Sequence, residues 1–595
     1  MRANSRREMR TASLLLTVAM LLSMTSMILA LHGTYLLGDN SWHAVYAEMI
    51  AQSMRDNHTP FTYSPWWNMG QPMLLYYQPL PELLLATLRI LTTLPAATLL
   101  KVLVALLWTL TPLCYYAFAR AFRFDPVPSA VASLAFTLLQ SASNAGAEFG
   151  SLALLGLYTQ AFGIPLMLLT IASFVSERNA RIVGLLLGLT ILCHPLYAFI
   201  ALISCLILAL WPHEAYIKDA MARMKTMGLA TLVAFAISAW YVLPLLIHHP
   251  PTRYPGMPFI DSPSIGSGAI NLLLGNYHSP GKWPLLWLAV LAGLVASWRQ
   301  DRRVLALSTA WFVLFLADPL LTRLPLLSDL HPFRFIGAVQ VFSVLGIAAL
   351  ASQIAKEPTR SSRIILAIVL LLLLLPAAGQ RLRMASAIDR RYHLEPDYAH
   401  EVALIAATLQ GTPGRFALKD VPHNLWTANE LVLRAKVPYL AGTNAPESSA
   451  FIQAHTFNDM SRQDYESDWV EALITGNNVA VPSFLQPIAR TEHLILYRYN
   501  GTTTPMTGCQ VTKDMTNDTC TLVLRMANDP GWRAIVDEET IRVQQDTAFP
   551  TVTIPEQVHQ IIFRYRFPKY RPWLLFFGLS ALLAFIWRPL QNRKL

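Results

Sequence analysis

The chain has few charged residues and few cysteines. Asp, Glu, Lys and Arg make up only 14% of its 595 residues, whereas 54% are hydrophobic. Soluble domains contain about 25% charged residues, so this composition excludes an ordinary soluble globular protein and indicates a membrane protein. Five cysteines are too few for a disulfide-rich secreted scaffold. The 15 histidines contain no HxH pair, so their spacing defines no histidine-rich zinc site.

The formal charge of +10 does not indicate a nucleic-acid partner. A nucleic-acid binder gathers Lys and Arg on an exposed face or arm, whereas here they lie mostly between apolar runs. That spacing is typical of cytoplasmic loops under the positive-inside rule. Four arginines in the first ten residues place the N-terminus in the cytoplasm, and the basic tail RPLQNRKL places the C-terminus there too.

The apolar runs predict a polytopic α-helical membrane protein of about 12 transmembrane helices. The first run approaches a full span and precedes no cleavage site, so we expect a retained helix and not a signal peptide. The run from Met73 to Leu94 contains two prolines and Glu82, and we expect it to lie at the outer membrane surface. The run from Ile182 to Trp211 is too long for one upright helix, and His194 with Pro195 predicts a break into two short passes.

The predicted organisation has four parts. Residues 1–379 form the transmembrane domain, which includes a long first outer loop at 32–96. An extracytoplasmic α/β domain (380–500) and an extracytoplasmic β domain (501–570) follow, and 571–595 form a last transmembrane helix and a cytoplasmic tail. HEVALIAATLQG predicts an amphipathic helix that ends at Gly411, and GRFAL and LILYRY predict strands. From Thr502 onward, short alternating runs predict a β-sandwich or sheet.

The cysteines fall into two groups. Cys114, Cys193 and Cys205 lie in apolar stretches and are expected to be core residues. Cys509 and Cys520 bracket a short polar turn and could close a hairpin disulfide if this region faces an oxidising compartment. Free thiols at these two positions fit the sequence equally well.

The first outer loop carries the clearest chemical signal. Asp39 follows the first membrane helix closely, where a carboxylate is costly unless it is solvated or functional. His43 comes four residues later, so the two side chains share one face if this segment forms a helix. Asp39 could also be only a helix N-cap. Trp66 and Tyr77 belong to an aromatic group that could form an interfacial belt or line a sugar or lipid site.

The order of motifs resembles the membrane glycosyltransferases of the GT-C fold. These motifs are GDNSWH after the first helix, PFTYSPWWNMGQP, YYQPLPELLLATL, CHPLYAF, AWYVLPLL, HPFRF and the C-terminal DPGWRAIVDEETIRV. The pattern is most similar to an uncharacterised branch known as 6-pyruvoyl-tetrahydropterin-synthase-related membrane domains, a neighbour of the YfhO-like proteins. The pterin wording implies no activity here, because such a synthase needs a zinc site built from histidines.

This resemblance implies transfer of a sugar from a polyprenyl-phosphate-linked donor to an extracytoplasmic glycan, lipid or protein. Asp39 would be the general base for the acceptor hydroxyl. Arg334, in HPFRF, would stabilise the phosphate leaving group, with weaker help from His331. The alternative for Arg334 is an arginine that only reaches for the membrane surface. The implied location is a plasma membrane with the large domain outside.

Two further residues have open roles. Glu148 would be a second carboxylate that positions the acceptor or holds a divalent cation such as Mg or Mn with Asp39, or it is an ordinary solvated loop residue. His194 would either pack in the membrane or contact the lipid phosphate. No other cofactor is predicted.

Two absences bear on rival functions. The first loop has no adjacent acidic pair and the outer domain no WWDYG-like motif, which disfavours oligosaccharyltransferase chemistry. The main rival is a non-catalytic scaffold, sensor or lipid- or polysaccharide-handling transporter. A transporter should place several polar residues deep in its spans, and apart from His194 the predicted spans are nearly bare.

Overall fold

The structure, a computed structural model, describes most of the chain. The described residues are 2–32, 36–64, 71–75, 77–141, 146–211, 216–247, 265–278, 285–324, 327, 330–357, 359–391, 393, 395–439, 470–477, 479–501, 507–510, 519–524, 532–537, 539–544, 551–555, 561–566, 571, 573–578 and 580.

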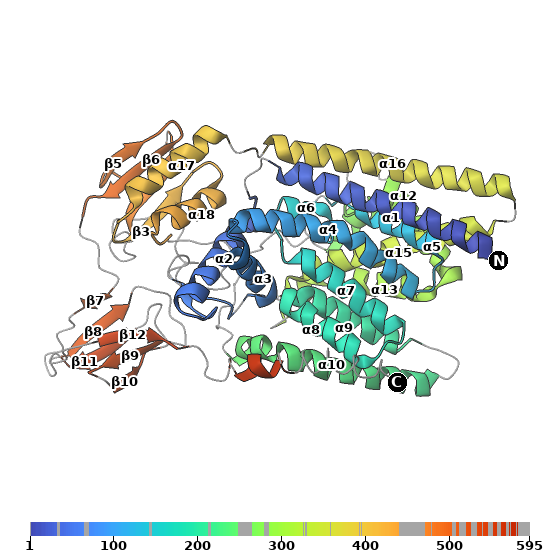
Figure 1. The fold of residues 1–595 in the computed structure, drawn as a ribbon, viewed down its shortest axis with the longest axis horizontal. Coiled ribbons are helices and arrows are strands. Elements are labelled where there is room, and N and C mark those ends of the chain that lie inside the picture. Colours follow the sequence, from blue (N-terminus) through green and yellow to red (C-terminus); the bar gives the residue numbers. More distant parts are fainter. Residues whose placement is uncertain are drawn as a thin grey trace.

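Helices dominate the first two thirds of the chain, as predicted (Figure 1). They are α1 (Arg2–Leu31), α2 (Asp39–Asp56), α3 (Pro79–Thr92), α4 (Ala96–Ala121), α5 (Pro126–Thr137), α6 (Phe149–Ala153), α7 (Gln160–Val175), α8 (Ala180–Cys193), α9 (Pro195–Ala209), α10 (Tyr216–Ile247), α11 (Ile265–Leu273), α12 (Leu285–Gln300), α13 (Arg302–Leu316), α14 (Asp318–Leu321), the 3-10 helix η2 (Pro332–Phe335), α15 (Ile336–Lys356), α16 (Arg360–Arg391), α17 (Pro396–Leu409) and α18 (Asn424–Ala435).

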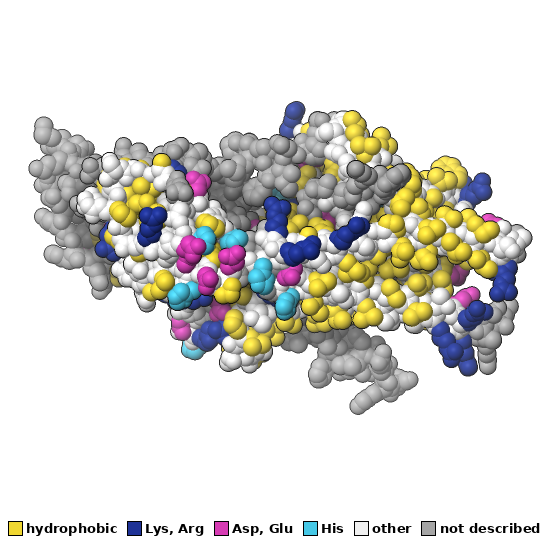
Figure 2. Space-filling view, turned by 90° about the horizontal axis from the view of Figure 1, so that it is seen from above, with side chains coloured by type: hydrophobic (Ala, Val, Ile, Leu, Met, Phe, Trp, Pro, Cys, Tyr) yellow, Lys and Arg dark blue, Asp and Glu magenta, His cyan; other side chains and the backbone are white. Residues whose placement is uncertain are grey.

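Several helices are membrane spans by length and composition. Among the described residues, five are long and apolar enough to cross a bilayer, in α1, α4, α10, η2 with α15, and α16, and five shorter apolar helices accompany them. The span in α15 is the centre of the bundle, because 94% of its apolar window is buried against 17% for α16. Figure 2 shows hydrophobic side chains covering much of the helical part on the visible face. These observations support a multi-pass membrane protein.

Two backbone features organise the bundle. Gly293 of α12 faces Gly346 of α15 so closely that a Cβ atom on Gly293 would clash with the Gly346 carbonyl group. Small residues allow this close helix packing. The predicted break at His194 is confirmed, because its extended backbone (φ −166°, ψ 98°) separates α8 from α9, which pack on each other.

The C-terminal part contains mixed sheets. A four-stranded sheet in the order β3-β4-β6-β5 consists of Arg415–Lys419, Val470–Gly476, Leu494–Tyr499 and Leu485–Arg490, and only the β3–β4 pair is parallel. The predicted strands GRFAL and LILYRY are β3 and β6. The predicted helix is α17, which ends two residues before Gly411 in the left-handed conformation.

Two three-stranded antiparallel sheets follow. One has the order β11-β8-β7 (Thr551–Pro555, Thr519–Leu524 and Thr507–Gln510), and the other β10-β9-β12 (Glu539–Arg542, Trp532–Val536 and Ile561–Tyr565). Leu524 and Val552 of the first sheet share a small core with Trp532 and Val536 of the second. Two sheets around one core are the arrangement of a β-sandwich.

The three cysteines whose side chains the structure describes are wholly or partly buried, as predicted from their apolar stretches. Cys193 and Cys205 are buried and Cys114 is half-buried. Cys509 lies on β7 and Cys520 on β8, two paired antiparallel strands, as a hairpin requires. Their side chains lie outside the described part of the chain, so the disulfide stays a prediction.

The short helices α2 and α3 lie between the helical bundle and the sheets (Figure 1). Helix α3 packs on α2, α4 and α8, and α18 of the four-stranded domain packs on α2. The Asn429 side chain of α18 donates a hydrogen bond of 2.8 Å to the Ser41 hydroxyl of α2. The segment between α1 and α4 therefore connects the bundle with the domain of α17, α18 and the four-stranded sheet, which is called the outer domain below after its predicted location.

Candidate functional site

A close crossing of two loops fixes the position of Asp39. Gly38 (φ +51°) and Gly156 (φ +74°) meet here, and a Cβ atom on Gly38 would clash with the carbonyl oxygen of Leu155. The Asp39 N–H donates a 3.0 Å hydrogen bond to the same oxygen. Positive φ and close approach both exclude a side chain at Gly38. The half-buried Asp39 lies in the first turn of α2, where the helix dipole stabilises a carboxylate; Gly38, not Asp39, holds the cap position.

One helical turn further along α2, His43 forms a fully buried pair with Glu82 of α3. The His43 Nδ1 lies 2.5 Å from the Glu82 Oε1, and both side chains have 0% exposure. Burial raises the pKa of Glu82, and the neighbouring His43 opposes that rise. The sequence placed His43 near Asp39 but missed its partner. The available signal was the carboxylate itself, which interrupts an otherwise apolar run.

Tyr77 links this pair to the other charged groups. Its hydroxyl lies 3.4 Å from the His43 Nε2, a long contact. Burial raises the pKa of Tyr77, the charges of Asp39 and Glu82 raise it further, and Arg334 lowers it. Asp39, Glu82 and Arg334 therefore all lie within electrostatic range of this one hydroxyl. Tyr77 therefore marks the point where the predicted base and the predicted phosphate-binding residue approach each other.

Arg334 enters the site from η2, the short turn that precedes the central helix α15. His331 adopts the left-handed conformation (φ +50°), and its carbonyl oxygen accepts a 2.8 Å hydrogen bond from the Arg334 N–H. Arg334 is half-buried, and its Nε has no hydrogen-bond partner among the residues that the structure describes. A half-buried guanidinium with unused donor capacity suits an anionic ligand. The roles of Arg334 and His331 stay predictions.

His194 lies at the break between α8 and α9 and is 4% exposed. Its ring packs edge-on against Tyr197 with centroids 4.7 Å apart, and a Cβ atom on Gly163 would lie 2.6 Å from the His194 Cβ. These contacts support the packing role. Arg334 also acts electrostatically on His194, so the histidine lies near the predicted phosphate site. Both predicted roles therefore stay open.

Glu148 is not a solvated loop residue. That alternative is wrong, because the side chain has 0% exposure at the start of α6. One carboxylate oxygen accepts a 3.2 Å hydrogen bond from the Gly146 N–H, and the other has no partner in the described part of the chain. Burial raises the pKa of Glu148 to about 7, against the opposing effect of the Gly146 hydrogen bond. Glu148 and Arg334 both act electrostatically on Tyr197, which places this carboxylate beside the same region.

Gln340 of α15 supports the Glu148 loop, although no sequence pattern indicated this role. Its side-chain oxygen accepts a 2.7 Å hydrogen bond from the Ala147 N–H, and its amide donates a 2.6 Å hydrogen bond to the Tyr277 carbonyl. A lone glutamine in an apolar helix is recognisable as functional only once its partners are known. Trp66, also predicted for the site, lies outside the described residues.

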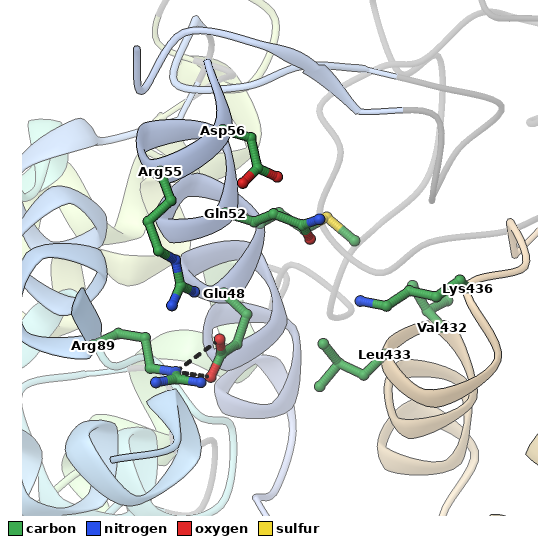
Figure 3. A pocket seen from close by; sticks show the side chains of 9 residues that line it. Glu48, Gln52, Arg55, Asp56, Arg89, Val432, Leu433 and Lys436 are labelled. Carbon is green, nitrogen blue, oxygen red and sulfur yellow. Dashed lines mark hydrogen bonds and ion pairs between the residues drawn. The ribbon is translucent and has the colours of Figure 1, made fainter. Parts of the chain in front are cut away.

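A polar cleft of about 390 Å³ lies between α2, α3 and α18 (Figure 3). Glu48 and Gln52 share one face of α2, and Lys436 lies on the opposite wall of the cleft. The Arg89 Nε lies 2.6 Å from the Glu48 Oε1, so the main acidic group of the cleft is already neutralised. The cleft separates the outer domain from the loop helices, and it does not include Asp39.

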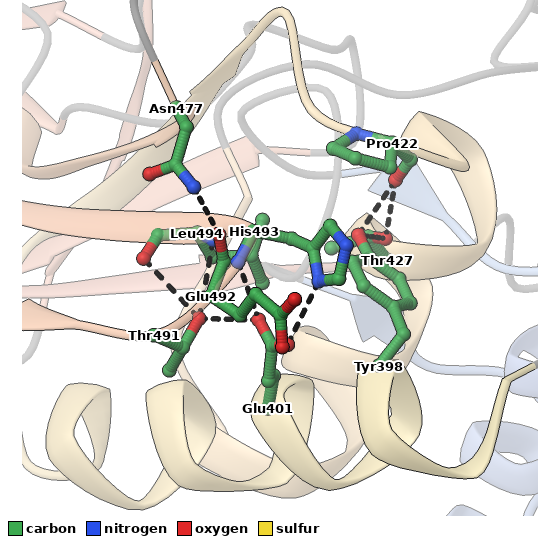
Figure 4. A network of polar contacts seen from close by, with 9 residues as sticks. All are labelled: Tyr398, Glu401, Pro422, Thr427, Asn477, Thr491, Glu492, His493 and Leu494. Carbon is green, nitrogen blue, oxygen red and sulfur yellow. Dashed lines mark hydrogen bonds and ion pairs between the residues drawn. The ribbon is translucent and has the colours of Figure 1, made fainter.

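The outer domain contains a possible metal-binding group. Ligand atoms of Glu401, Glu492 and His493 lie within 4.8 Å of one another. The Glu401 carboxylate already accepts hydrogen bonds from the Thr491 hydroxyl (2.5 Å) and from the N–H (2.9 Å) and Nδ1 (2.8 Å) of His493 (Figure 4). The group thus works as an ion-pair network without a metal. It lies on α17 and the turn between β5 and β6, not beside Asp39.

Comparison with known proteins identifies the fold. No known protein family and no curated sequence matches the chain. The solved structure of the arabinofuranosyltransferase AftD from Mycobacteria matches with a TM-score of 0.54 and 16% identity over 83% of this chain. The oligosaccharyltransferase AglB from Archaeoglobus fulgidus, bound to an inhibitory peptide and a dolichol-phosphate, matches with a TM-score of 0.53 and 13% identity over 78% of this chain. The chain has a GT-C-like fold.

The coverage and the sequence identity of these matches determine which conclusions they support. The chain spans 40% of the length of the arabinofuranosyltransferase and 69% of the length of the oligosaccharyltransferase. At such low identity the likeness concerns the fold of membrane glycosyltransferases and not a particular substrate. The function must therefore be argued from the site.

Proposed function

We propose that this protein is a membrane glycosyltransferase that transfers a sugar from a polyprenyl-phosphate-linked donor to an extracytoplasmic acceptor. The acceptor is an envelope glycan, a lipid or a protein. The observation that carries the proposal is the convergence of Asp39, the His43–Glu82 pair and Arg334 on Tyr77. A base, a cation and a hydroxyl donor are the groups that displacement at a sugar phosphate requires.

Each of these residues has a separate role in the proposed reaction. Asp39 takes the proton of the acceptor hydroxyl while the acceptor oxygen forms a bond to the anomeric carbon. The bond between the anomeric carbon and the phosphate oxygen breaks, and polyprenyl phosphate leaves with the electron pair. Arg334 binds that phosphate and offsets its growing charge. Tyr77, held by His43, orients the sugar phosphate by donating its hydroxyl hydrogen.

Two carboxylates of this set of residues are suited to bind a divalent cation. Mg²⁺ is usually bound by one or two carboxylates together with substrate phosphates. Asp39 and the unpartnered oxygen of Glu148 are the carboxylate ligands that would hold it. When bound, the ion would neutralise charge on the donor phosphate. The steps above do not depend on it.

The orientation in the membrane is part of the proposal. The basic loops favour cytoplasmic termini, about 12 spans in a plasma membrane and an extracytoplasmic outer domain. The position of α2 and α3 at the end of the bundle that carries the sheets agrees with a site at the outer surface (Figure 1). Within the GT-C fold, the motif order supports the branch beside the YfhO-like proteins.

The test is transfer of radiolabelled sugar from polyprenyl-phosphate donors in membranes that contain the full chain. Asp39→Asn keeps the shape of the side chain and removes the base, so we expect transfer to fall by about 10² to 10⁴. Asp397→Asn is the matched control, because Asp397 is an exposed aspartate in the first turn of α17. Equal transfer by Asp39→Asn and wild type would remove Asp39 from the mechanism. No transfer by wild type from any donor would favour a non-catalytic scaffold, sensor or transporter.

A further inference from the structure

Arg571, at the start of the predicted last transmembrane helix, is a fully buried cation that the proposed chemistry does not use. One of its terminal nitrogens donates a hydrogen bond to the Leu74 carbonyl oxygen, 497 positions earlier in the chain. Its guanidinium lies over the Phe61 ring, 4.2 Å from the centroid, with the Trp240 ring of α10 5.9 Å away. Aromatic faces at such distances attract a guanidinium. Arg571 therefore contacts both ends of one stretch between α1 and α4.

That stretch forms the base of a hairpin. Strands β1 (Tyr63–Ser64) and β2 (Gln71–Pro72) pair in antiparallel fashion. Leu74 (φ +59°) follows the second strand, and its N–H donates a 2.6 Å hydrogen bond to the Tyr46 hydroxyl of α2. Its carbonyl oxygen accepts the hydrogen bond from Arg571. Leu74 is thus held by α2 on one side and by the C-terminal end of the chain on the other.

The helix that carries Arg571 is itself fixed to the bundle. Residues 573–578 are helical and lie beside α10, as the short red helix in Figure 1 shows. A Cβ atom on Gly578 would lie 2.8 Å from the Ile237 carbonyl oxygen of α10. Leu574 and Leu575 pack against the buried cluster that contains Ile237 and Trp240. Arg571 can therefore act as an anchor, because its own backbone is held in place.

The two three-stranded sheets contact the same hairpin at a second point. The Tyr63 ring of β1 lies 4.8 Å from the Trp532 ring and 4.7 Å from the Tyr565 ring, measured between centroids. These three rings belong to the small core that the two sheets share. Tyr565 precedes Arg571 by six residues. The hairpin is thus held by neighbouring parts of the C-terminal region.

The hairpin leads directly to the proposed transfer site. Tyr77 follows Leu74 by three residues. The same Tyr46 that binds Leu74 stacks on Trp42 with centroids 4.5 Å apart, and Trp42 packs edge-on against Tyr77 at 5.1 Å. A displacement of Leu74 would therefore reach Tyr77 both along the chain and through these rings.

We infer that Arg571 is a positioning residue, which anchors Leu74 and thereby fixes the Tyr77 hydroxyl beside His43. This inference rests on the proposed function, in which Tyr77 orients the sugar phosphate. It gives the last helix a role in the site, although this helix contributes no reacting group. A small misplacement of an orienting group is enough to slow a reaction strongly.

Hydrogen exchange of the full-length protein in lipid nanodiscs tests the anchor without reference to activity. Arg571→Met removes the charged donor, so the amides of Met73 and Leu74, which donate hydrogen bonds at the hairpin base, should exchange about tenfold faster. Arg571→Lys keeps a cation but lacks the planar guanidinium, and it should restore part of the protection. Arg564→Met is the control, because Arg564 is exposed on β12. Unchanged exchange in Arg571→Met would overturn the anchor.

A kinetic double-mutant cycle tests whether the anchor acts through Tyr77. In the sugar-transfer assay, Arg571→Met should lower kcat by about tenfold. Tyr77→Phe removes the hydroxyl that the anchor positions, so adding Arg571→Met to Tyr77→Phe should lower kcat by less than about twofold more. A purely structural loss would instead multiply with the loss from Tyr77→Phe. Multiplied losses would overturn the positioning role.

A milder variant and two further outcomes complete the test. If Arg571→Met does not fold, Phe61→Leu removes the ring beneath the guanidinium, and faster exchange at Leu74 supports the anchor whereas unchanged exchange overturns it. Full transfer by Tyr77→Phe would show that the proposed role of Tyr77 is wrong, and the positioning role would fall with it. No transfer by wild type would overturn the proposed function, while the exchange comparison would still decide the anchor.

Discussion

Within the described residues, two histidine–glutamate pairs lie in contrasting surroundings. His43 and Glu82 join α2 to α3 with no exposure on either side chain. His493 and Glu401 lie in the outer domain, where the histidine side chain is 40% exposed. The nitrogen–oxygen distances are similar, 2.5 Å and 2.8 Å. Contact geometry therefore does not separate the two pairs, whereas burial does.

Burial changes what each pair contributes. An exposed ion pair is screened by water and contributes about 0 to 1 kcal/mol. A buried pair must offset a large desolvation cost, and removal of one partner leaves the other stranded. Titratable groups with strongly perturbed pKa values cluster at functional sites. Under the proposed function, the inner pair serves the site, whereas the outer pair fixes a local turn.

The largest expected effect comes from Glu82→Ala. Loss of this carboxylate leaves His43 buried without its partner, which should cost about 3 to 5 kcal/mol of unfolding free energy. His43 is then no longer held in place beside Tyr77, so sugar transfer should fall as well. Thermal unfolding of the full chain in nanodiscs and the transfer assay measure the two effects.

Glu401→Ala in the outer domain is the matched change for this comparison. It should lower the local stability of α17 and leave transfer within twofold of wild type. If Glu82→Ala were as mild as Glu401→Ala in both measurements, burial would not distinguish the two pairs.

A second contrast concerns two glycines with positive φ. Gly38 (φ +51°) contacts the Leu155 carbonyl, whereas a Cβ atom on Gly411 (φ +82°) would meet no atom of the described residues within 4 Å. Alanine at either position costs about 1 to 2 kcal/mol for the left-handed backbone. Only Gly38→Ala should also displace Asp39, and we expect at least tenfold slower transfer from it.

Gly411→Ala isolates the backbone cost, because it shares the strain and lacks the clash. If Gly38→Ala transferred sugar as fast as Gly411→Ala, the loop crossing would not position Asp39. Thermal unfolding of both variants should show that the proteins are folded before rates are compared.

The sequence predicted the helices better than the site. Apolar runs with basic loops predict helices because hydrophobicity is read along the chain, and the break at Pro195 follows from its missing N–H. Asp39 and Arg334 were predicted as site residues through motifs that carry the resemblance, and Glu148 was predicted as a second carboxylate. Glu82, Gln340 and Arg571 were not predicted, because their importance depends on partners 39 or more residues away. Local patterns carry no information on such contacts.

The same limit explains the two incorrect alternatives. A glutamate between glycines and serines, such as Glu148, has the local composition of a solvated loop. Its burial arises from α15 and α16, which come about 190 residues or more later in the chain. Asp39 as an N-cap was one residue from the observed boundary, an error typical of helix ends.

A small effect is expected from His493→Gln in the outer pair. The His493 side chain is 40% exposed and Thr491 still donates to Glu401, so the loss should be about 0.2 to 1 kcal/mol. Hydrogen exchange of the amides in β6 of the full-length protein measures this local stability. A loss above about 3 kcal/mol would show that the outer pair behaves like a buried one.

The smallest effect is a pH dependence of the same local stability. Burial alone would raise the pKa of Glu401, but hydrogen bonds from Thr491 and His493 outweigh it and lower the pKa below 4.5. The hydrogen bond to Glu401 raises the pKa of His493 above 6.5. A lowered carboxylate pKa adds stability above its ordinary value, and this stability is lost as the pH falls through the folded-state pKa. A raised histidine pKa adds stability below 6.5, and this stability is lost as the pH rises through the folded-state value.

Protection of β6 from exchange, corrected for the intrinsic rate at each pH, should therefore be greatest between about pH 4.5 and pH 6.5. It should decline on both sides by a fraction of a kcal/mol. His493→Gln should abolish the decline on the alkaline side and leave an acid-side decline, because Glu401 still accepts from the Thr491 hydroxyl. The buried pair of His43 and Glu82 should show a different pH dependence of stability. Burial raises the pKa of Glu82, so by the same linkage its effect on stability must fall as the pH rises, with no optimum in this window.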